Sequence, residues 1–378
     1  MNVAVPKEVE QGERRVALVP DTAKLLIAAG LDVTIQTGAG AAAFLTDEMY
    51  EKVGVKVADR AGIMLHYADA VLKVQAPRES EIALLKKGAV LISFLQPATQ
   101  GDIVKSLAQH GITAFSLELL PRISRAQSMD ALSSQASASG YKAVLMAADR
   151  LGKFFPMMMT AAGTVAPARV LVMGAGVAGL QAIATARRLG AVVSAYDVRP
   201  AVKEEVQSLG ATFIELALET QEGEGGYARE QSEEFLTKQR ELIGEHVAKS
   251  DVVITTAAIP GRRAPLLVTG DMVKGMRPGS VIVDLAAETG GNVELTQAGK
   301  DVDVGGVTII GITNVPSTMA LHTSQLFARN VANLLLHLVK NGTIVLDFAD
   351  EITKGSCVTH GGEIVNDRAK QLLAPAAS

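Results

Sequence analysis

The sequence has one cysteine, no apolar run long enough to cross a membrane, and no excess of basic side chains. Cys357 alone cannot form an intramolecular disulfide or a zinc site built from several thiolates. Acidic residues number 40 against 36 lysines and arginines, which argues against a nucleic-acid-binding protein. The six histidines are scattered without paired spacing. We therefore expect no metal site and a reducing compartment.

The missing apolar run is informative because the chain as a whole is apolar. Hydrophobic residues make up 48% of it and its mean hydropathy is +0.25. A membrane-spanning helix needs about 18–20 apolar residues in succession. The closest segment, residues 154–168, has 15 residues and contains two prolines and a glycine. Charges interrupt the N-terminal segment before any apolar core forms, so we expect neither a signal peptide nor a membrane span.

Short β-branched runs alternate with helical stretches, which is typical of parallel βαβ units. A length of 378 residues favours two domains. In the first half, the expected strands are 2–5, 33–36, 71–74, 90–94 and 112–116, and the expected helices are 21–29, 47–53, 79–87 and 103–109. In the second half, the expected strands are 169–173, 192–196, 212–215, 251–255, 280–285 and 307–310, and the expected helices are 178–189, 201–208 and 232–248.

Two longer helical patterns, residues 133–151 and 324–339, lie at the junctions of these halves. We predict an α/β fold with two Rossmann-like, doubly wound parallel-sheet domains joined by two long helices. The first, discontinuous domain is 1–132 plus 325–378, with the C-terminal tail packing back onto it, and the second is 133–324. Pro156 and Pro167 bracket an expected loop, in which the methionines at 157–159 are predicted to pack as apolar filler.

The strongest local motif is RVLVMGAGVAG, in which Gly174, Gly176 and Gly179 follow a predicted strand and open a predicted helix. Such glycines permit a tight turn, close approach of a pyrophosphate and tight helix–strand packing. Asp197 lies 18 residues after Gly179 at the end of the next strand, where an acid accepts the adenosine ribose hydroxyls. The motif predicts an NAD(H) site, although Arg199 could receive a 2′-phosphate. A glycine-rich turn without a ligand is the alternative.

Residues 121–135, PRISRAQSMDALSSQ, concentrate polar side chains just before the first long helix. They are expected to face the cleft between the domains as an active-site loop. An equally open interpretation is that Asp130 or Ser128 simply caps the helix.

Two further sets of residues stay ambiguous. The acidic, glycine-rich segment 219–231 around Tyr227 could be a lid over a bound nucleotide or an exposed insertion. Arg14, Arg15, Lys73 and Gln96 stand near the ends of predicted strands, where α/β ligand sites gather, although such residues are also common on surfaces.

Several long segments resemble the NAD(H)-binding component of proton-translocating nicotinamide nucleotide transhydrogenases, and the resemblance covers essentially the whole chain. The segments are VAVPKE…RRVALVP, PRISRAQSMDALSSQ, FPMMMTAAGTVAPARVLVMGAGVAGLQAIATARRLGA, GGYAREQSEEF, TTAAIPG, PGSVIVDLAAETGGN and TNVPS. The resemblance implies an oxidoreductase subunit of the Si-specific type, which exchanges hydride with NADP(H) on a partner beta subunit while a membrane subunit translocates protons.

The resemblance also implies roles for individual residues. Arg122 and Asp130 would hold the nicotinamide, and Gln127 would bridge toward the partner's nucleotide. The polar-loop positions implied to orient the nicotinamide and ribose are Arg122, Gln127, Asp130 and Ser133. The implied cofactor contacts are Ile123, Ser124, Leu132, Gly174, Ala175, Gly176, Val177, Gly179, Asp197, Val198, Arg199, Gly226, Tyr227, Gln239 and Ala258. The family further implies a homodimer in the cytoplasm, peripheral at the inner face of the plasma membrane through its partner subunits.

Alanine dehydrogenase is the alternative family, because it shares the fold and the PKE…RVAL pattern. Interconversion of alanine with pyruvate and ammonia needs a proton donor and acceptor besides hydride transfer. In that family a lysine and a histidine serve. Lys73 matches the lysine, whereas Gln96 takes the histidine's place and cannot titrate. Hydride exchange between two nicotinamides needs only their alignment. A non-catalytic NAD-sensing module is a third possibility, but it would have no use for the polar loop.

Overall fold

The computed structural model describes residues 1–215, 233–258 and 261–373. Two compact units make up the chain: unit 1 contains residues 1–135 and 316–378, and unit 2 contains residues 136–315. Each unit is built on a sheet in which parallel pairs dominate and helices cover both faces. The expected α/β, Rossmann-like fold class is confirmed.

Unit 1 has an eight-stranded sheet in the order β19-β18-β6-β5-β4-β1-β2-β3. The strands are β1 (Asn2–Val5), β2 (Asp32–Gln36), β3 (Lys56–Ala58), β4 (Ala70–Leu72), β5 (Val90–Ser93), β6 (Thr113–Ser116), β18 (Cys357–His360) and β19 (Glu363–Ile364). The strands from β1 to β6 run parallel, whereas β18 and β19 add antiparallel to β6. The C-terminal tail thus completes the first sheet, as predicted. A small hairpin of β16 (Val339–Lys340) and β17 (Thr343–Ile344) precedes it.

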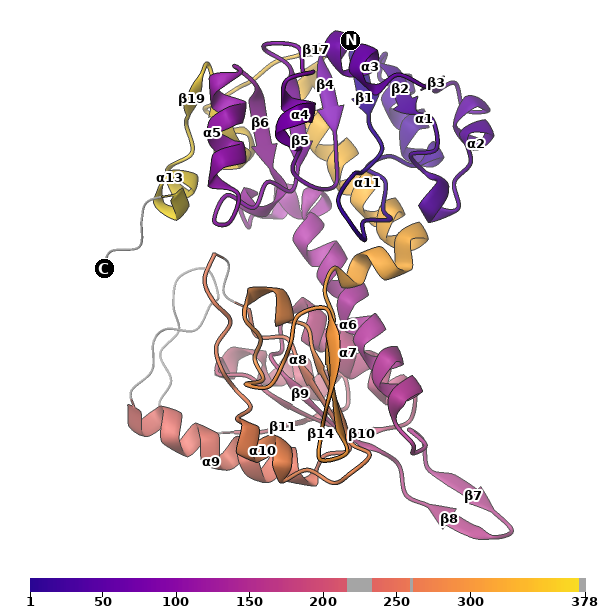
Figure 1. Cartoon of the computed structure of the whole chain (residues 1–378), viewed down its shortest axis with the longest axis vertical. Coiled ribbons are helices and arrows are strands. Elements are labelled where there is room, and N and C mark those ends of the chain that lie inside the picture. The colour runs from indigo at the N-terminus through magenta and orange to yellow at the C-terminus, as the bar shows by residue number, and fades with distance from the viewer. Residues whose placement is uncertain (216–232, 259–260, 374–378) are drawn as a thin grey trace. The chain divides into compact units, whose positions relative to one another are not determined.

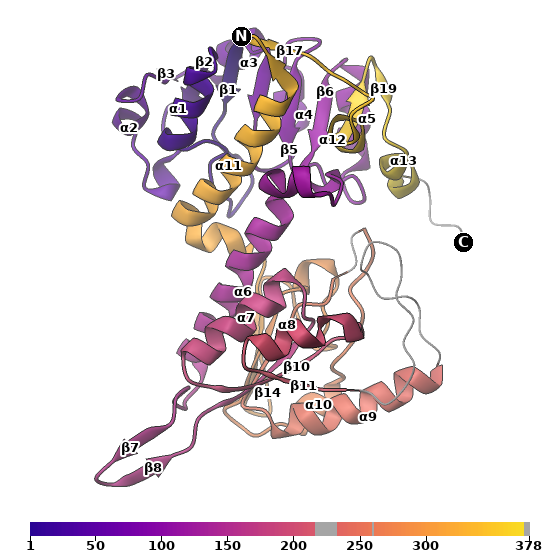
Figure 2. The same ribbon diagram turned by 180° about the vertical axis from the view of Figure 1, so that it is seen from behind.

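Helices cover unit 1 on both faces. They are α1 (Pro20–Ala28), α2 (Asp47–Glu51), α3 (Ala61–Tyr67), α4 (Glu79–Ile82), α5 (Gly101–Gln109), α11 (Ala320–Leu338), α12 (Glu351–Ser356) and α13 (Asp367–Leu373). Apolar residues of α1 and α11 pack on one face, which Figure 2 views, and those of α3 and α5 pack on the other, which Figure 1 views. The expected apolar stripe of α11 is confirmed, because Phe327, Val331 and Leu335 are fully buried.

Unit 2 has a seven-stranded sheet in the order β11-β10-β9-β12-β13-β15-β14. The strands are β9 (Arg169–Met173), β10 (Val192–Tyr196), β11 (Thr212–Phe213), β12 (Val252–Thr255), β13 (Val281–Asp284), β14 (Lys300–Val304) and β15 (Val307–Gly311). Only β14 pairs antiparallel in this sheet, with β15. Strands β12 and β13 are buried along their whole length, which explains their continuous apolar sequence.

Unit 2 is also covered on both faces. Its helices are α7 (Val177–Arg188), α8 (Lys203–Ser208), α9 (Glu233–Lys249) and α10 (Gly270–Lys274), and α6 (Ala131–Arg150) enters it from unit 1. Apolar residues of α6, α7 and α8 pack on one face of the sheet, and those of α9 and α10 pack on the other. No helix among the described residues is both long and apolar enough to cross a bilayer.

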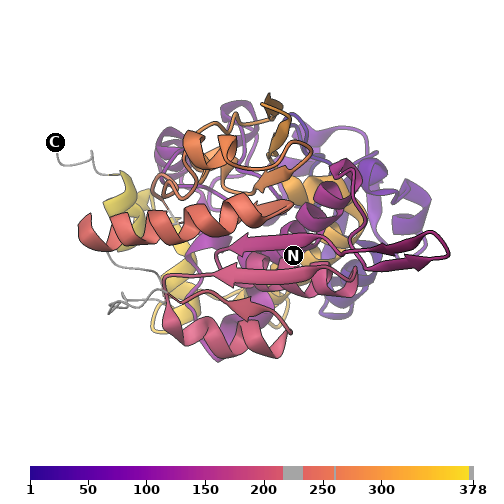
Figure 3. The same cartoon turned by 90° about the horizontal axis from the view of Figure 1, so that it is seen from below.

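The structure corrects three expectations. Residues 156–167 form no plain loop but contain a hairpin of β7 (Met158–Thr160) and β8 (Gly163–Val165), which extends from the body of unit 2 (Figures 1 and 3). The prediction that the methionines there are apolar filler is wrong, since Met159 is 77% exposed. The helix expected at 79–87 ends at Ile82, and the strand expected at 71–74 ends at Leu72.

Candidate functional site

The turn between β9 and α7 carries the glycine motif. Gly174 has φ +100°, a conformation that side chains disfavour, and a Cβ there would lie 2.5 Å from the Thr256 hydroxyl oxygen. At Gly179 a Cβ would lie 1.8 Å from the Gly174 carbonyl oxygen. The first glycine is therefore required by the backbone conformation, and the third by the close packing of helix on turn.

The N-terminus of α7 is open to a ligand. Gly176 is the N-cap residue, is exposed, and has nothing within 4 Å of the position that a Cβ would take. It has no side chain to accept the first N–H groups of the helix, so these groups and the helix dipole are available to an anion. Helix α6 packs tightly behind this turn, since a Cβ at Gly140 would lie 2.0 Å from the Ala178 carbonyl oxygen.

Asp197 follows β10 and is tied to the glycine turn. Its Oδ2 accepts a hydrogen bond of 2.7 Å from the Ala175 N–H and one of 2.9 Å from Nη2 of Arg199. Its Oδ1 accepts 2.9 and 3.0 Å bonds from the backbone N–H and Nε of Arg199. These four bonds use the roughly four acceptor positions of a carboxylate. A ribose diol would therefore have to replace Arg199 at this carboxylate.

The turn after β12 lies against the glycine motif on its other side. The Thr256 hydroxyl donates a 3.0 Å bond to the Gly174 carbonyl, and the Thr256 N–H donates a 2.8 Å bond to that of Met173. Ala258, predicted to lie near the nucleotide, is exposed at the end of this turn. Gly174, Asp197 and the 256–258 turn thus come together at the carboxyl edge of the unit 2 sheet.

Other predicted contacts are placed unevenly. Val198 is partly buried and packs against the core on the α9 face of the sheet. Gln239 lies on α9, but its side chain is outside the described part of the chain, as are Gly226 and Tyr227 entirely. The prediction of a lid at Tyr227 therefore stays a prediction.

The polar loop 121–135 belongs to unit 1 and includes a 3₁₀ helix at Ser124–Met129. Asp130 caps α6: its Oδ1 accepts a 2.9 Å bond from the Ser133 N–H and its Oδ2 a 2.6 Å bond from the Ser133 hydroxyl. The capping alternative is thus realised, while each carboxylate oxygen keeps acceptor capacity for a ligand. Asn330 and Asn333 of α11 both donate 2.9 Å bonds to the Ser128 carbonyl, which fixes the loop on α11.

The remaining predicted residues of this loop are mostly exposed. Gln127, Ser124 and Arg122 lie at the surface of unit 1, and Leu132 is 41% exposed on α6. Ile123 is partly buried against the main core of the unit. An apolar side chain exposed beside polar ones, on a loop anchored from beneath, is suited to contact a flat heteroaromatic ring.

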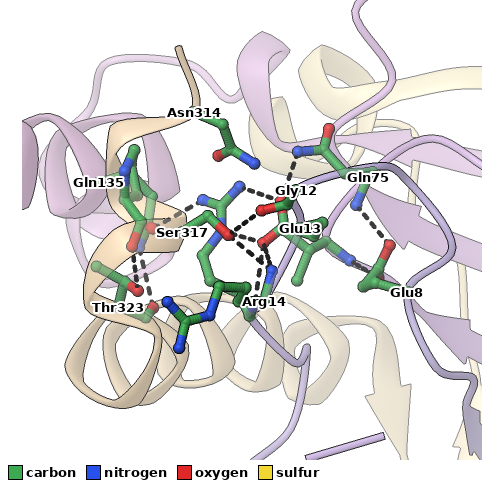
Figure 4. Close-up of polar contacts among 12 residues, drawn as sticks. Glu8, Gly12, Glu13, Arg14, Gln75, Gln135, Asn314, Ser317 and Thr323 are labelled. Carbon is green, nitrogen blue, oxygen red and sulfur yellow. Dashed lines mark hydrogen bonds and ion pairs between the residues drawn. The ribbon is translucent and has the colours of Figure 1, made fainter. Parts of the chain in front are cut away.

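The carboxyl edge of the unit 1 sheet is filled by buried charges. Lys73 is 1% exposed, and its Nζ lies 2.8 Å from a Glu81 oxygen and 3.5 Å from a Glu8 oxygen. Burial raises the pKa of Glu8 above its ordinary value, although the charge of Lys73 opposes the shift. Figure 4 shows Glu8, Gln75 and Glu13 linked by hydrogen bonds. Lys73 therefore has its charge committed within the unit.

Arg15 forms the second buried pair at this edge. Its Nε and Nη2 bond the two Glu13 oxygens at 2.8 and 2.7 Å, and its Nη1 donates a 2.9 Å bond to Gln135 of α6. Burial acts to raise the pKa of Glu13, but the hydrogen bonds and charge of Arg15 outweigh it and lower that pKa from 4.5 to about 2. Arg14 is exposed, with its N–H donating a 2.7 Å bond to the Ser317 hydroxyl.

Gln96 ends the β5 segment in an unusual conformation. Its φ is +47°, which is strained for a residue with a side chain, and its amide group is exposed. Its N–H donates a 2.9 Å bond to Glu118, a carboxyl whose pKa is raised by burial. Gln96 offers hydrogen bonds at this position but no titratable group.

Family models match both halves of the chain. The model described as "Alanine dehydrogenase/PNT, N-terminal domain" matches residues 4–139, and the corresponding C-terminal domain matches residues 143–367. One curated relative, an NAD(P) transhydrogenase subunit alpha of Rhodospirillum rubrum, is 51% identical over 376 residues, covering 97% of this chain and 98% of the relative. The chain belongs to the NAD(P) transhydrogenase alpha subunit family.

Solved structures agree with this transhydrogenase assignment. The transhydrogenase from Sinorhizobium meliloti matches with a TM-score of 0.86 and 46% identity, covering 97% of this chain and all of that one. An L-alanine dehydrogenase matches with a TM-score of 0.82 and 27% identity, covering 99% of this chain and all of that one. The resemblance to transhydrogenases is confirmed, and the fold is shared with alanine dehydrogenase.

Sequence reasoning missed several residues that shape this transhydrogenase-family site. Thr256, Asn292 and Asp284 form a hydrogen-bonded connection behind the glycine turn, and Gly140 permits the close packing of α6. One local signal was present, because VIVD ends an apolar strand with an acid, where a buried carboxylate needs donors. The partners of Asp284 lie 8 to 29 residues away, so spacing could not identify them.

Proposed function

We propose that this subunit binds NAD(H) at the glycine turn of unit 2 and exchanges hydride with NADP(H) held by a partner beta subunit. A membrane subunit of the same complex would couple this exchange to proton translocation. The observation that carries the proposal is the open helix N-terminus at Gly176 beside the Asp197 carboxylate, in a chain that is 51% identical to a transhydrogenase subunit. The subunit would lie in the cytoplasm, peripheral to the plasma membrane through its partners.

The chain's own groups would divide the work. The first N–H groups of α7 would hold the pyrophosphate, since Gly176 leaves room for close approach. Asp197 would accept the adenosine ribose hydroxyls and repel a 2′-phosphate. We assign Arg122, Asp130 and Ser133 to orienting the nicotinamide, and Gln127 to bridging toward the partner's nucleotide. The bound nicotinamide supplies a hydride donor or acceptor at its C4 atom, in the Si-specific manner of this class.

The absence of a proton-transfer role among these residues suits that reaction. Exchange of hydride between two nicotinamides requires alignment and no general acid or base. Oxidation of alanine would require both, yet Gln96 cannot titrate and Lys73 is held between Glu81 and Glu8. These two side chains favour transhydrogenation over an alanine dehydrogenase activity.

Calorimetric titration and stopped-flow mixing test the proposal. The wild-type protein should bind NADH more tightly than NADPH, and Asp197→Ala should weaken NADH binding and narrow that preference. Mixed with an NADP(H)-binding subunit, the wild-type protein should transfer hydride directly, and Asp130→Asn should bind NADH but transfer more slowly. Failure of the wild-type protein to bind NADH would contradict the proposal.

Two alternatives have their own experiment. Steady production of NADH from alanine and NAD⁺ by this protein alone would establish an alanine dehydrogenase instead. NADH binding without any hydride exchange in the reconstituted mixture would point to a sensing module. We expect neither result.

We also propose that the subunit is a homodimer. Support comes from the β7–β8 hairpin of unit 2, where Met157, Met159 and Val165 are 57%, 77% and 43% exposed. An extended apolar hairpin is a favourable surface for a second copy to cover. Met159→Lys should shift the protein toward monomer in sedimentation velocity, whereas Met49→Lys on α2, where the methionine is 40% exposed, should not. Equal dimer fractions in the two variants would remove the hairpin from the interface.

A further inference from the structure

We propose that Asn292 is a positioning residue for the nicotinamide half of the nucleotide site. The inference rests on the proposed NAD(H) binding and deepens it. Asn292 itself would not touch the nucleotide, because it is fully buried. It would act through the backbone of Ala257, at the turn that follows β12.

The side chain of Asn292 holds the peptide groups of Ala257 from both sides. Its Oδ1 accepts a 3.0 Å bond from the Ala257 N–H, and its Nδ2 donates a 2.8 Å bond to the Ala257 carbonyl. The second Nδ2 proton is used in a 2.8 Å bond to the carbonyl of Pro265. Both donors of the amide are thus used, so its orientation is fixed by its surroundings.

A buried carboxylate holds Asn292 in turn. Asp284, at the end of β13, is 0% exposed, and its Oδ2 accepts bonds of 2.9 Å from the Asn292 N–H and 2.7 Å from the Thr296 hydroxyl. Its Oδ1 accepts a 2.9 Å bond from the Thr255 hydroxyl on β12. Gly291 passes so close that a Cβ there would lie 2.9 Å from the carboxylate. Asp284 therefore ties the end of β12 to the segment that carries Asn292.

The connection reaches the glycine turn through Thr256. The Thr256 hydroxyl bonds the Gly174 carbonyl at 3.0 Å, and the Ala257 nitrogen lies 3.2 Å from the position of a Cβ on Gly174. The amide of Asn292 thus fixes the second wall of a site whose first wall is the glycine motif. Its displacement would move the exposed end of the turn at Ala258 relative to Gly174.

Sheet topology indicates which part of a dinucleotide this wall meets. The order of strands reverses between β9 and β12, and a dinucleotide lies across such a reversal with one mononucleotide on each side. The glycine turn and Asp197 are on the β9–β10 side, which takes the adenosine half. The turn after β12 is on the opposite side and would meet the nicotinamide half.

The test compares the affinities for NADH and for ADP, which carries only the adenosine half and the two phosphates. Asn292→Ala should lower the ratio of NADH to ADP affinity about tenfold, because the unpartnered Ala257 peptide no longer fixes the turn. The matched control is Asn366→Ala in unit 1, since Asn366 is also buried and bonds Gly355 O and Ala369 N through its amide. Asn366→Ala should lower stability without changing the ratio.

A second pair of variants serves if Asn292→Ala does not fold. Thr256→Val removes the hydroxyl bond to Gly174 at nearly constant volume, whereas Thr256→Ser retains it. We expect the NADH to ADP ratio to fall for the valine variant and to stay at the wild-type value for the serine variant. Wild-type ratios in both Asn292→Ala and Thr256→Val would overturn the inference while wild-type NADH binding left the proposed function intact. A wild-type protein that bound no NADH would instead overturn the proposed function.

Discussion

The carboxyl edges of the two sheets are built on the same plan and filled in opposite ways. In unit 1 the strand order reverses between β1 and β4, and in unit 2 it reverses between β9 and β12. Such reversals open a crevice in which α/β proteins bind ligands. In unit 2 a short glycine turn leads from β9 into an uncapped helix N-terminus. In unit 1 the long segment between β1 and α1 turns its own charges inward at the same kind of place.

The difference shows that topology locates a crevice without deciding its use. Lys73 with Glu8 and Arg15 with Glu13 satisfy one another inside unit 1, so charges there serve the fold. The glycine turn of unit 2 leaves its N–H groups without an internal acceptor side chain, so they are available to an anion. Substitutions at the two edges should therefore separate binding from stability.

The largest expected effect is that of Gly179→Ala in unit 2. A Cβ there would lie 1.8 Å from the Gly174 carbonyl oxygen and 2.8 Å from its carbon, so helix and turn must separate. We expect a loss of about 3 kcal/mol of stability and a fall in NADH affinity of about 100-fold or more, measured by denaturant unfolding and calorimetry.

Gly176→Ala is the matched control for this substitution. Its Cβ would meet nothing within 4 Å, and Gly176 has an ordinary φ of −78°. Stability should change by less than about 1 kcal/mol, while NADH affinity falls, because the methyl group occupies the approach of the pyrophosphate. Equal destabilisation by the two alanines would contradict the separate roles given to these glycines.

At the unit 1 edge, Glu13→Gln should damage stability and spare binding. It leaves the guanidinium of Arg15, which is 4% exposed, without its charged partner. Breaking a buried pair in this way costs about 3–5 kcal/mol. Urea unfolding should report that loss, and NADH affinity should stay within about twofold of wild type. A variant of wild-type stability would mean that the pair is dispensable, and Asp21→Asn, at an exposed pair with Lys24, provides the baseline.

The same carboxylate predicts a pH dependence. The pKa of Glu13 is lowered from 4.5 to about 2 in the folded protein, so its contribution is complete above pH 4.5 and is lost as the pH falls toward 2. The difference amounts to about 3 kcal/mol. The stability gap between wild type and Glu13→Gln should therefore shrink through this window. A gap that stayed constant from pH 5 to pH 3 would show that the glutamate carboxylate is not what stabilises Arg15.

These contrasts explain what the sequence could predict. Gly174, Gly176 and Asp197 could be identified because turn geometry and strand spacing are local properties. The pairing of Lys73 with Glu8 joins residues 65 positions apart, and that of Arg15 with Gln135 joins residues 120 apart. The same residue types at strand ends were therefore equally compatible with a substrate site. The exposed methionines of the β7–β8 hairpin misled for a related reason, because an apolar side chain does not reveal whether its cover lies within the chain.

The smallest expected effect returns to Asp197 and concerns Arg199. Three of the four bonds to the Asp197 carboxylate come from Arg199, two of them from its guanidinium. Arg199→Ala should free acceptor positions for the ribose hydroxyls and leave the negative charge unopposed. NADH affinity should then rise by about threefold or less, and NADPH should be rejected more strongly, because a 2′-phosphate would meet a bare carboxylate. Calorimetric titration with both nucleotides measures the two changes together. A variant that lost NADH affinity would show that the guanidinium contacts the nucleotide, and Arg199 would then belong to the binding surface of unit 2 and not to its internal pairs.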